Sequence, residues 1–139
     1  MIYYISLLFV LLFNTPLHSN PELDLEITGI KKDAGFIEVG IYNSEEYFLE
    51  EGKSFKTYKI PVKNKKASIR ISDLPQGNYA ITLYHDENED GKCNMNFLGI
   101  PKEPYAFSNN FKPKFSAPSF EDCVFNLKEN LSLDIKLIH

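Results

Sequence analysis

The sequence has no tryptophan, only two cysteines and three histidines, and no excess of positive charge. A nucleic-acid-binding protein needs a basic face to neutralise phosphates, and the formal net charge of −4 argues against that class. His18, His85 and His139 are scattered, so the close pair of ligands typical of a zinc site is missing. There is also no Ser or Cys nucleophile motif, no internal repeat and no long amphipathic helix. These absences leave a chain without a recognisable catalytic motif.

Charged side chains are also absent from the first residues, Met1 to Ser19, and the run from Ile2 to Phe13 is almost wholly apolar. The run is too short to span a bilayer comfortably as a helix, which needs roughly 20 apolar residues. Its length, position and polar end predict a secretory signal peptide over residues 1–19, with cleavage near Ser19. The alternatives are an uncleaved anchor and a buried strand. A signal peptide would make the protein periplasmic or secreted, with no membrane span in the mature chain.

The remaining residues, 20–139, have the composition of one globular domain. Over the whole chain, hydrophobic residues make up 43% and charged residues 24%, which excludes a disordered chain, and the frequent Phe and Tyr favour strands. Apolar and polar residues alternate with a period of two in successive segments. The expected strands cover residues 23–28, 36–42, 55–62, 67–71, 79–84, 123–127 and 131–138. The pattern predicts an all-β protein, a single antiparallel β-sandwich of about seven strands, immunoglobulin- or transthyretin-like, with one long loop.

The long loop runs from His85 to Ala117, lacks periodicity and is rich in Asn, Pro and Gly. Loops of this length are uncommon in compact domains and usually have a purpose. We expect its aromatic side chains to hold it against the sheet; they are Phe97, Tyr105, Phe107, Phe111 and Phe115.

The loop begins with oxygen-bearing side chains at alternate positions, Asp86, Asn88 and Asp90, followed by Gly91. A loop that curls around a hard cation turns alternate side chains inward, so this spacing suits Ca²⁺. The alternative is an Asx-rich turn, in which Asp and Asn side chains cap their own backbone.

The other expected ligands of the cation are the carbonyl of Lys92 and the side chains of Asn94 and Asn96. Phe97 stands where an EF-hand loop has its bidentate Glu, so Glu103 is expected to supply the missing carboxylate, with Glu87 and Glu89 as alternatives. Two carboxylates and several neutral oxygens imply weak affinity, roughly in the 0.1–1 mM range.

Two further interpretations use side chains of the same loop. His85, Asp86 and Glu103 form a cluster of titratable groups, which suggests a hydrolase acting on an envelope polymer, although adjacent strand residues point to opposite faces. A small-ligand or peptide carrier would instead use Tyr105, Phe107 and Phe111 as an aromatic platform.

The two cysteines, Cys93 and Cys123, both lie in the predicted mature chain. An oxidising compartment permits a disulfide between them, which would tie the loop to a strand near the C-terminus. In the chain-entropy model such a link stabilises by roughly 3–4 kcal/mol. The alternative is two separate buried thiols that behave as small hydrophobic side chains.

Several motifs together resemble a family of small exported bacterial proteins, the domain-of-unknown-function family 2141. The matching segments are Leu74-Pro75-Gln76-Gly77-Asn78-Tyr79-Ala80, His85-Asp86-Glu87-Asn88, Asp90-Gly91-Lys92, Asn96-Phe97-Leu98-Gly99-Ile100-Pro101-Lys102-Glu103, Phe107-Ser108-Asn109 and Pro118-Ser119-Phe120-Glu121-Asp122. The resemblance covers nearly the whole mature chain and implies an exported β-sandwich protein without an assigned activity.

The chain departs from the family pattern at a few positions. Asn94 stands where the family usually has Asp, which lowers the expectation of tight metal binding. Pro104 and Ala106 occupy positions usually held by Gly. Cys93 and Cys123 replace residues that are usually apolar, and this shared departure favours the disulfide. The interpretation we adopt is a non-enzymatic binding or structural module of the bacterial envelope or exterior, with Ca²⁺ as candidate cofactor and an envelope or extracellular polymer or protein as partner.

Overall fold

The computed structural model describes residues 19–139, so the predicted signal peptide lies outside the described residues except for Ser19. The described chain is nearly all-β, as predicted. Its strands are β1 (Leu23–Thr28), β2 (Phe36–Tyr42), β3 (Lys56–Pro61), β4 (Ala67–Ile71), β5 (Gly77–Asp86), β6 (Tyr105–Phe107), β7 (Phe125–Leu127) and β8 (Leu131–Lys136). The helical segments are one 3₁₀ turn, η1 (Ser108–Asn110), and one short helix, α1 (Phe120–Cys123). None of these helices is long and apolar enough to cross a membrane.

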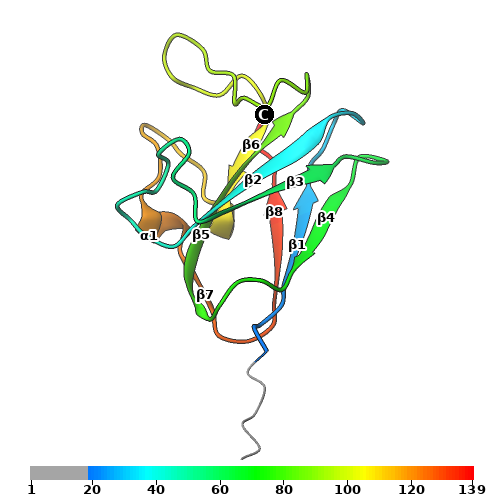
Figure 1. The fold of residues 1–139 in the computed structure, drawn as a ribbon. Coiled ribbons are helices and arrows are strands. Elements are labelled where there is room, and N and C mark those ends of the chain that lie inside the picture. The colour runs from blue at the N-terminus through cyan, green and yellow to red at the C-terminus, as the bar shows by residue number, and fades with distance from the viewer. Residues whose placement is uncertain (1–18) are drawn as a thin grey trace, which may run out of the picture.

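The strands form two sheets (Figure 1). One has the order β4-β1-β8, and the other has the order β3-β2-β5-β6, with β7 pairing to the start of β5. Neighbours are antiparallel except β1 and β8, which run parallel from Leu23 opposite Leu131 to Thr28 opposite Lys136. The prediction of purely antiparallel sheets is wrong for this pair, because alternation reports which face of a strand is buried and not its direction.

Alternate apolar side chains of both sheets fill one core, as the period of two predicts. Leu23, Leu25 and Ile27 of β1 are at most 2% exposed, and they belong to the same cluster as Ile37 of β2 and Ile81 of β5. Burying such a side chain contributes about 1.5–3 kcal/mol, so this core is the main source of stability.

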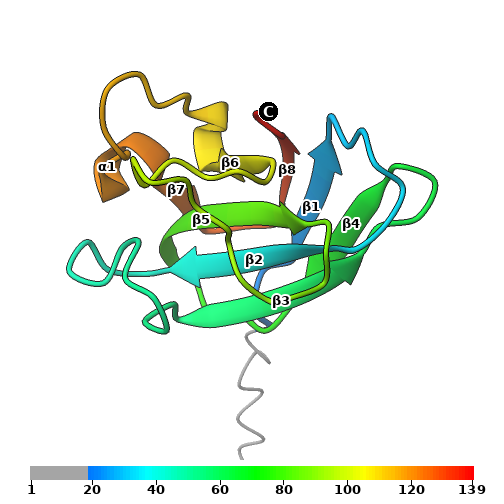
Figure 2. The same ribbon diagram turned by 90° about the horizontal axis from the view of Figure 1, so that it is seen from above.

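The two sheets are also joined at their edges. The backbone N–H groups of Tyr105 and Ile138 donate to each other's carbonyls at 3.1 and 2.7 Å, which links β6 to the extension of β8. At the other edge, β3 and β4 are consecutive strands in different sheets, and a turn closed by paired Lys63 and Lys66 connects them. Figure 2 shows the strands arranged around the core from above.

A second, smaller cluster covers the outer face of β5. Tyr42 and Ala80 pack there against Phe120 and Cys123 of α1. Phe107 and Phe111 are half-buried against this cluster, so they hold their segment to the sheet as predicted. The same prediction is wrong for Phe97 and Phe115, whose side chains are exposed. β5 is therefore buried on both faces, with the main core on one side and this cluster on the other.

The expected strand over residues 123–127 is replaced by α1 and the shorter β7. Ser119 accepts a hydrogen bond from the Asp122 N–H at 3.2 Å, and the Asp122 carboxylate accepts one from the Ser119 N–H at 2.8 Å. This reciprocal capping box begins the helix, and Ser-x-x-Asp is its sequence signal. β5 is longer than expected at both ends, and β6 lies inside the segment expected to be loop.

Candidate functional site

The candidate site is the loop of residues 87–104, which leaves the sheet after β5 and returns into β6 (Figure 1). The His85 N–H donates to the Pro104 carbonyl at 2.7 Å, which holds the two ends of the loop together. The loop has a polar base, residues 86–94 with Glu103, and a projecting hairpin, residues 94–102.

Asp86, the last residue of β5, is fully buried under the base of the loop. Its carboxylate oxygens accept hydrogen bonds from the backbone N–H groups of Asp90, at 3.2 Å, and Gly91, at 2.8 Å. The turn that brings these groups back to Asp86 uses positive φ at Glu89 and Gly91. Asp86 therefore anchors the first turn of the loop.

Asp90 is the centre of the polar base. Its Oδ1 accepts a hydrogen bond from the Lys92 N–H at 2.9 Å, and its Oδ2 accepts one each from the side-chain amides of Asn88, at 3.1 Å, and Asn94, at 3.0 Å. These bonds, above all the one from Asn94, lower the pKa of the Asp90 carboxyl. The Asp90 carboxylate is thus charged at neutral pH and held by neutral donors.

Glu103 completes the base from the far end of the loop. Its Oε1 accepts a hydrogen bond from the Glu87 N–H at 3.2 Å, and its Oε2 accepts one from the Asn94 N–H at 3.2 Å. Glu103 therefore lies beside the Asp/Asn segment, whereas Phe97, at the EF-hand position for the final acid, is 95% exposed.

The predicted ligands are partly brought together. The Asn94 amide nitrogen lies 3.0 Å from Asp90 Oδ2, 3.3 Å from the Lys92 carbonyl oxygen and 3.4 Å from Glu103 Oε2. Asn96 lies outside this group, because its Oδ1 accepts from the N–H groups of Leu98 and Ile100. Within residues 19–139 no three His, Cys, Asp or Glu side chains gather as a metal-binding group, so a cation here would depend on amide and carbonyl oxygens.

His85 and Asp86 do not form a catalytic pair. His85 is fully buried, and its Nε2 lies 2.7 Å from the Ala34 carbonyl oxygen, away from the Asp86 carboxylate. Its Nδ1 has no hydrogen-bond partner and lies 3.6 Å from Glu87 Oε1. A hollow of about 640 Å³ is lined by Asp24, Arg70 and their neighbours on the other sheet, and His85, Asp86 and Glu103 do not line it.

The predicted disulfide is not formed, and Cys93 and Cys123 are free thiols. Cys123 is enclosed beside Ala80 and Phe120, whereas Cys93 lies in the loop near Glu103. Burial raises the pKa of each thiol to about 11, with a smaller contribution from Glu103 at Cys93 and from Asp122 at Cys123. Both thiols are therefore protonated and weakly nucleophilic at neutral pH.

The aromatic platform expected for a carrier is not free. Tyr105 and Phe107 are half-buried and contact each other edge-on, with ring centroids 5.8 Å apart, and Phe111 packs on the second cluster. The exposed apolar side chains lie elsewhere. Four of them form the end of the hairpin, called here the apolar tip: Met95 (50% exposed), Phe97 (95%), Leu98 (68%) and Ile100 (49%).

The hairpin that presents the apolar tip is ordered by its own backbone. The Asn96 N–H donates to the Ile100 carbonyl at 2.8 Å, and the Lys102 N–H donates to the Asn94 carbonyl at 2.7 Å. The Asn96 side chain fills the turn through its bonds to Leu98 and Ile100. With the turn filled by a polar side chain, the apolar side chains project outward.

Three consecutive residues after β6 hold the neighbouring segments in place, and sequence reasoning gave them no role. The buried Ser108 hydroxyl accepts from the Ile81 N–H at 2.9 Å and donates to the Cys123 carbonyl at 2.5 Å. Asn109 donates to the Val124 carbonyl at 2.9 Å, and Asn110 donates to the Asp134 carbonyl at 2.8 Å. These residues form the polar clamp, and the run Ser-Asn-Asn before a Phe was its only signal.

Comparison with known proteins settles the family. The family model described as "Uncharacterized protein conserved in bacteria (DUF2141)" matches residues 25–134, from β1 into β8. The chain belongs to this family. The match includes the loop, the apolar tip and the polar clamp, and it confirms the resemblance found in the motifs. No curated protein and no solved structure matches the chain.

Proposed function

We propose that the protein is an exported, non-enzymatic binding module of the bacterial envelope or exterior, and that the loop of residues 87–104 carries its binding surface. The apolar tip is the observation that supports this proposal. Phe97 is 95% exposed on a hydrogen-bonded hairpin, so its side chain adds almost nothing to the core. Contiguous exposed apolar side chains of this kind mark interaction sites in soluble proteins.

The fold proposed for this module is an immunoglobulin- or transthyretin-like β-sandwich. The core shared by the two sheets supports it, as does the mainly antiparallel pairing. Superposition of an experimental structure on sandwich domains of that kind tests the assignment.

Export is proposed from the uncharged, apolar segment before Ser19. An envelope fraction of the producing bacterium should contain a chain whose first residue lies close to Asn20. Mass spectrometry of the intact protein measures this, and a chain that retains Met1 in the cytoplasm contradicts it.

Ca²⁺ is the cation proposed for the base of the loop. The Asn94 amide nitrogen now fills the space between oxygens of Asp90, Lys92 and Glu103. Turning that amide would point its own oxygen into the space, and a cation would then have four oxygens to bind. Asp86 and Asn88 would complete the proposed set of cation ligands. The Asn96 side chain is not included, because it is hydrogen-bonded within the hairpin. Oxygen ligands of mixed charge suit Ca²⁺.

Thermal or urea unfolding with and without 10 mM Ca²⁺ tests the cation. At a dissociation constant of about 0.1–1 mM, this concentration stabilises the folded state by about 1.4–2.7 kcal/mol. Asp90→Ala and Glu103→Ala should abolish the gain, and Asp73→Ala, at an exposed carboxylate on another part of the surface, should keep it. An equal gain in all four proteins, or no gain in any, contradicts the calcium proposal.

The binding function is tested with a tip variant, Phe97→Ser combined with Leu98→Ser. Wild type and variant are mixed with separated envelope fractions: membranes, wall polymer and soluble envelope proteins. We expect the variant to lose binding to one fraction, and Tyr47→Ser, at another exposed ring (41%), to bind as wild type does. If the tip variant binds every fraction as wild type does, the loop is not the binding surface.

A further inference from the structure

Five lysines lie on two neighbouring loops at one edge of the molecule. The loop between β1 and β2 carries Lys31 and Lys32, and the turn between β3 and β4 carries Lys63, Lys65 and Lys66. All five residues are exposed. We call these five lysines the basic patch.

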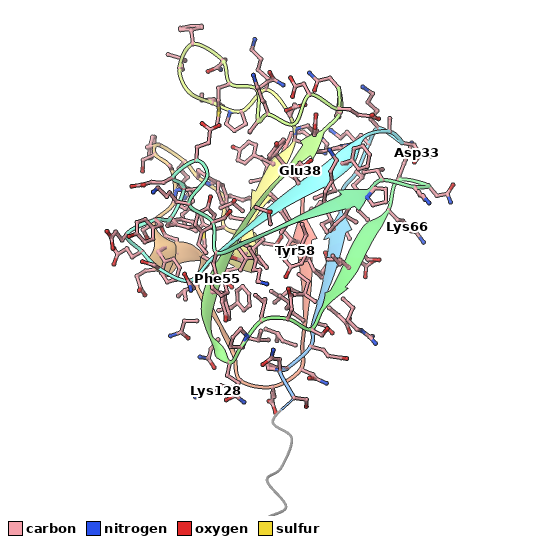
Figure 3. All side chains as sticks on the ribbon, viewed as in Figure 1. Asp33, Glu38, Phe55, Tyr58, Lys66 and Lys128 are labelled. Atoms are coloured by element: carbon pink, nitrogen blue, oxygen red, sulfur yellow. The ribbon has the colours of Figure 1, made fainter. Side chains whose placement is uncertain are left out.

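Hydrogen bonds hold the two loops of the basic patch together. The Lys65 N–H donates to Asp33 Oδ1 at 3.0 Å, which joins the turn to the loop between β1 and β2. Reciprocal backbone bonds between Lys63 and Lys66, each of 3.0 Å, close the turn itself. Figure 3 shows Asp33 and Lys66 at the same edge of the molecule. The backbone that carries the lysines is therefore fixed, and their charges belong to one surface.

The basic patch is positive although the chain as a whole is negative. The two loops carry five lysines and one acid, Asp33, a formal charge of +4, whereas the rest of the chain carries −8, which together give −4. Lys32 lies 3.7 Å from Glu87, which bounds the patch on the side of the loop of residues 87–104, where further acids lie. Within the described residues, the other four lysines of the patch form no salt bridge. The patch together with Glu87 keeps a formal charge of +3.

Lys65 holds its charge at a strained backbone position. Asn64 and Lys65 have φ values of 54° and 55°, so both central residues of this two-residue turn are left-handed. Asn-Gly is the sequence that such a turn favours, and lysine carries a steric cost there that glycine avoids. A charged side chain at a strained surface position favours a role for the charge over a role in the fold.

Charge without apolar surface indicates the kind of partner. None of the large exposed apolar side chains of the described chain lies in these two loops, where Ile30 and Val62 are buried. Stable attachment to a membrane needs an inserted apolar group besides lysines, so the basic patch does not suit a bilayer. One exposed ion pair contributes little, so a single free anion would not be held. A polymer that repeats its negative charge can instead contact several lysines at once.

We propose that the basic patch binds an anionic polymer of the bacterial envelope or exterior, one that repeats phosphate or carboxylate groups along its chain. The basic patch is separate from the apolar tip, so the proposal goes beyond the binding function proposed above and does not depend on it. The rest of the chain has a net negative charge and is repelled by such a polymer, so contact at the patch also orients the molecule.

Binding is measured by titrating the full chain into fluorescein-labelled polymers and following their anisotropy. Poly(glycerol phosphate) and polygalacturonate distinguish phosphate from carboxylate groups, and dextran is the neutral control. We expect binding to at least one of the two charged polymers and none to dextran. Raising NaCl from about 0.05 to about 0.3 M should weaken binding at least about tenfold, because salt screens exposed charges.

The location of the site is tested by a double variant, Lys63→Glu with Lys66→Glu. Its matched control is Lys112→Glu with Lys114→Glu, which makes the same change in net charge at two exposed lysines elsewhere. The first variant should bind about tenfold more weakly or worse, and the control should change affinity less than about twofold. Residues 63 and 66 pair across the turn, so two glutamates repel each other there as two lysines do, and the fold should be retained.

Lys65→Gly separates binding from folding. The change removes one positive charge and also relieves the strained φ, so the variant should melt no lower than wild type. Its affinity for the polymer should nevertheless fall about two- to fivefold. Unchanged affinity in both Lys65→Gly and the Lys63, Lys66 double variant would show that the polymer binds elsewhere.

Other results also overturn the polymer proposal: no binding to either charged polymer, equal binding to dextran, or an equal loss in the Lys112, Lys114 control. Tighter binding to phosphatidylglycerol vesicles or to single-stranded DNA than to both polymers overturns it as well. The tip variant should bind the polymers as wild type does. If neither polymer binds while binding to an envelope fraction still depends on the tip, the polymer proposal fails and the binding function of the tip stands. If only the basic patch variants lose binding, the reverse holds.

Discussion

The core between the two sheets and the segment of residues 86–124 are stabilised by different kinds of contact. Between the sheets, apolar side chains such as Leu25 and Ile81 are at most 1% exposed and pack in one cluster. In the later segment, polar side chains such as Asp86 and Ser108 hold backbone N–H and carbonyl groups. The first region gains stability from buried apolar area, and the second adds to its smaller apolar cluster a set of polar contacts that fix its shape. This difference explains why apolar side chains at the end of the loop remain free.

The largest contrast is expected between a core leucine and the tip phenylalanine. Leu25→Ala should destabilise the protein by about 2–5 kcal/mol, because a buried cavity replaces the side chain. Phe97→Ala should change the free energy of unfolding by less than about 0.5 kcal/mol, since the ring is 95% exposed. Urea unfolding of both variants measures the contrast, and a large loss in Phe97→Ala would show that the tip belongs to the core.

Two glycines with nearly the same positive φ, Gly35 and Gly91, differ in how closely their surroundings are packed. Gly35 (φ +73°) precedes β2, and a Cβ there would lie 2.1 Å from the Asp86 carbonyl oxygen, whereas a Cβ on Gly91 (φ +72°) would meet nothing within 4 Å. Gly91→Ala should cost only the backbone strain, about 1–2 kcal/mol. Gly35→Ala adds a steric clash and should cost about 2–4 kcal/mol in total. Equal losses in the two variants would mean that the end of β5 moves freely.

Ser108→Ala tests the polar clamp where it meets the core. The change leaves the buried Ile81 N–H without its side-chain acceptor and should cost about 1–3 kcal/mol. Ser119→Ala removes an exposed helix cap and should cost about 1 kcal/mol. Hydrogen exchange of the Ile81 amide, faster in Ser108→Ala but not in Ser119→Ala, localises the effect, and no change in exchange contradicts it.

The smallest expected contrast is in how two carboxylates, Asp73 and Asp90, contribute to stability as the pH falls. The pKa of Asp73 is lowered from 3.8, first by the Lys56 ammonium and then by the Tyr58 hydroxyl, and the pKa of Asp90 is lowered chiefly by the Asn94 amide. A carboxyl with a lower pKa in the folded state contributes stability above its unfolded value, near 3.9. This contribution is lost as pH falls through the folded value.

Asp73→Asn and Asp90→Asn should each reduce the loss of stability between pH 5 and pH 2, by at most about 1 kcal/mol for the exposed Asp73 pair. Salt separates the two, because it screens the Lys56 charge but not the amide partners of Asp90. Urea unfolding at two ionic strengths measures this. A salt effect of the same size at both positions would contradict the assignment of partners.

Most of the two sheets could be predicted from alternation alone. The bounds of β1, β2 and β4 match the expected strands, because one face of each is buried more deeply than the other. The expectation failed where other forces set the local structure. The Ser119 capping box turned the start of the expected strand at Cys123 into α1, and the pairing direction of β8 left no trace in its residues.

The structure of the loop of residues 87–104 could be predicted only in part. The spacing of Asp86, Asn88 and Asp90 suggested a cation loop or, as the alternative, an Asx-rich turn. The bonds from each acid to N–H groups a few residues ahead are those of the alternative. Composition could not separate Phe107, which packs, from Phe97, which projects. That outcome depends on Asn96 filling the hairpin turn, a contact between residues that no periodicity reports.

The parallel ladder between β1 and β8 sets an order of events for a newly made chain. β1 is the central strand of its sheet, yet one of its neighbours is the segment Leu131–Lys136. The strands β2, β3 and β5 pair across shorter separations in the sequence and can meet earlier. Until residue 136 is available, one edge of β1 keeps its backbone groups unpaired. The first strand to be made therefore waits for the last before its sheet is complete.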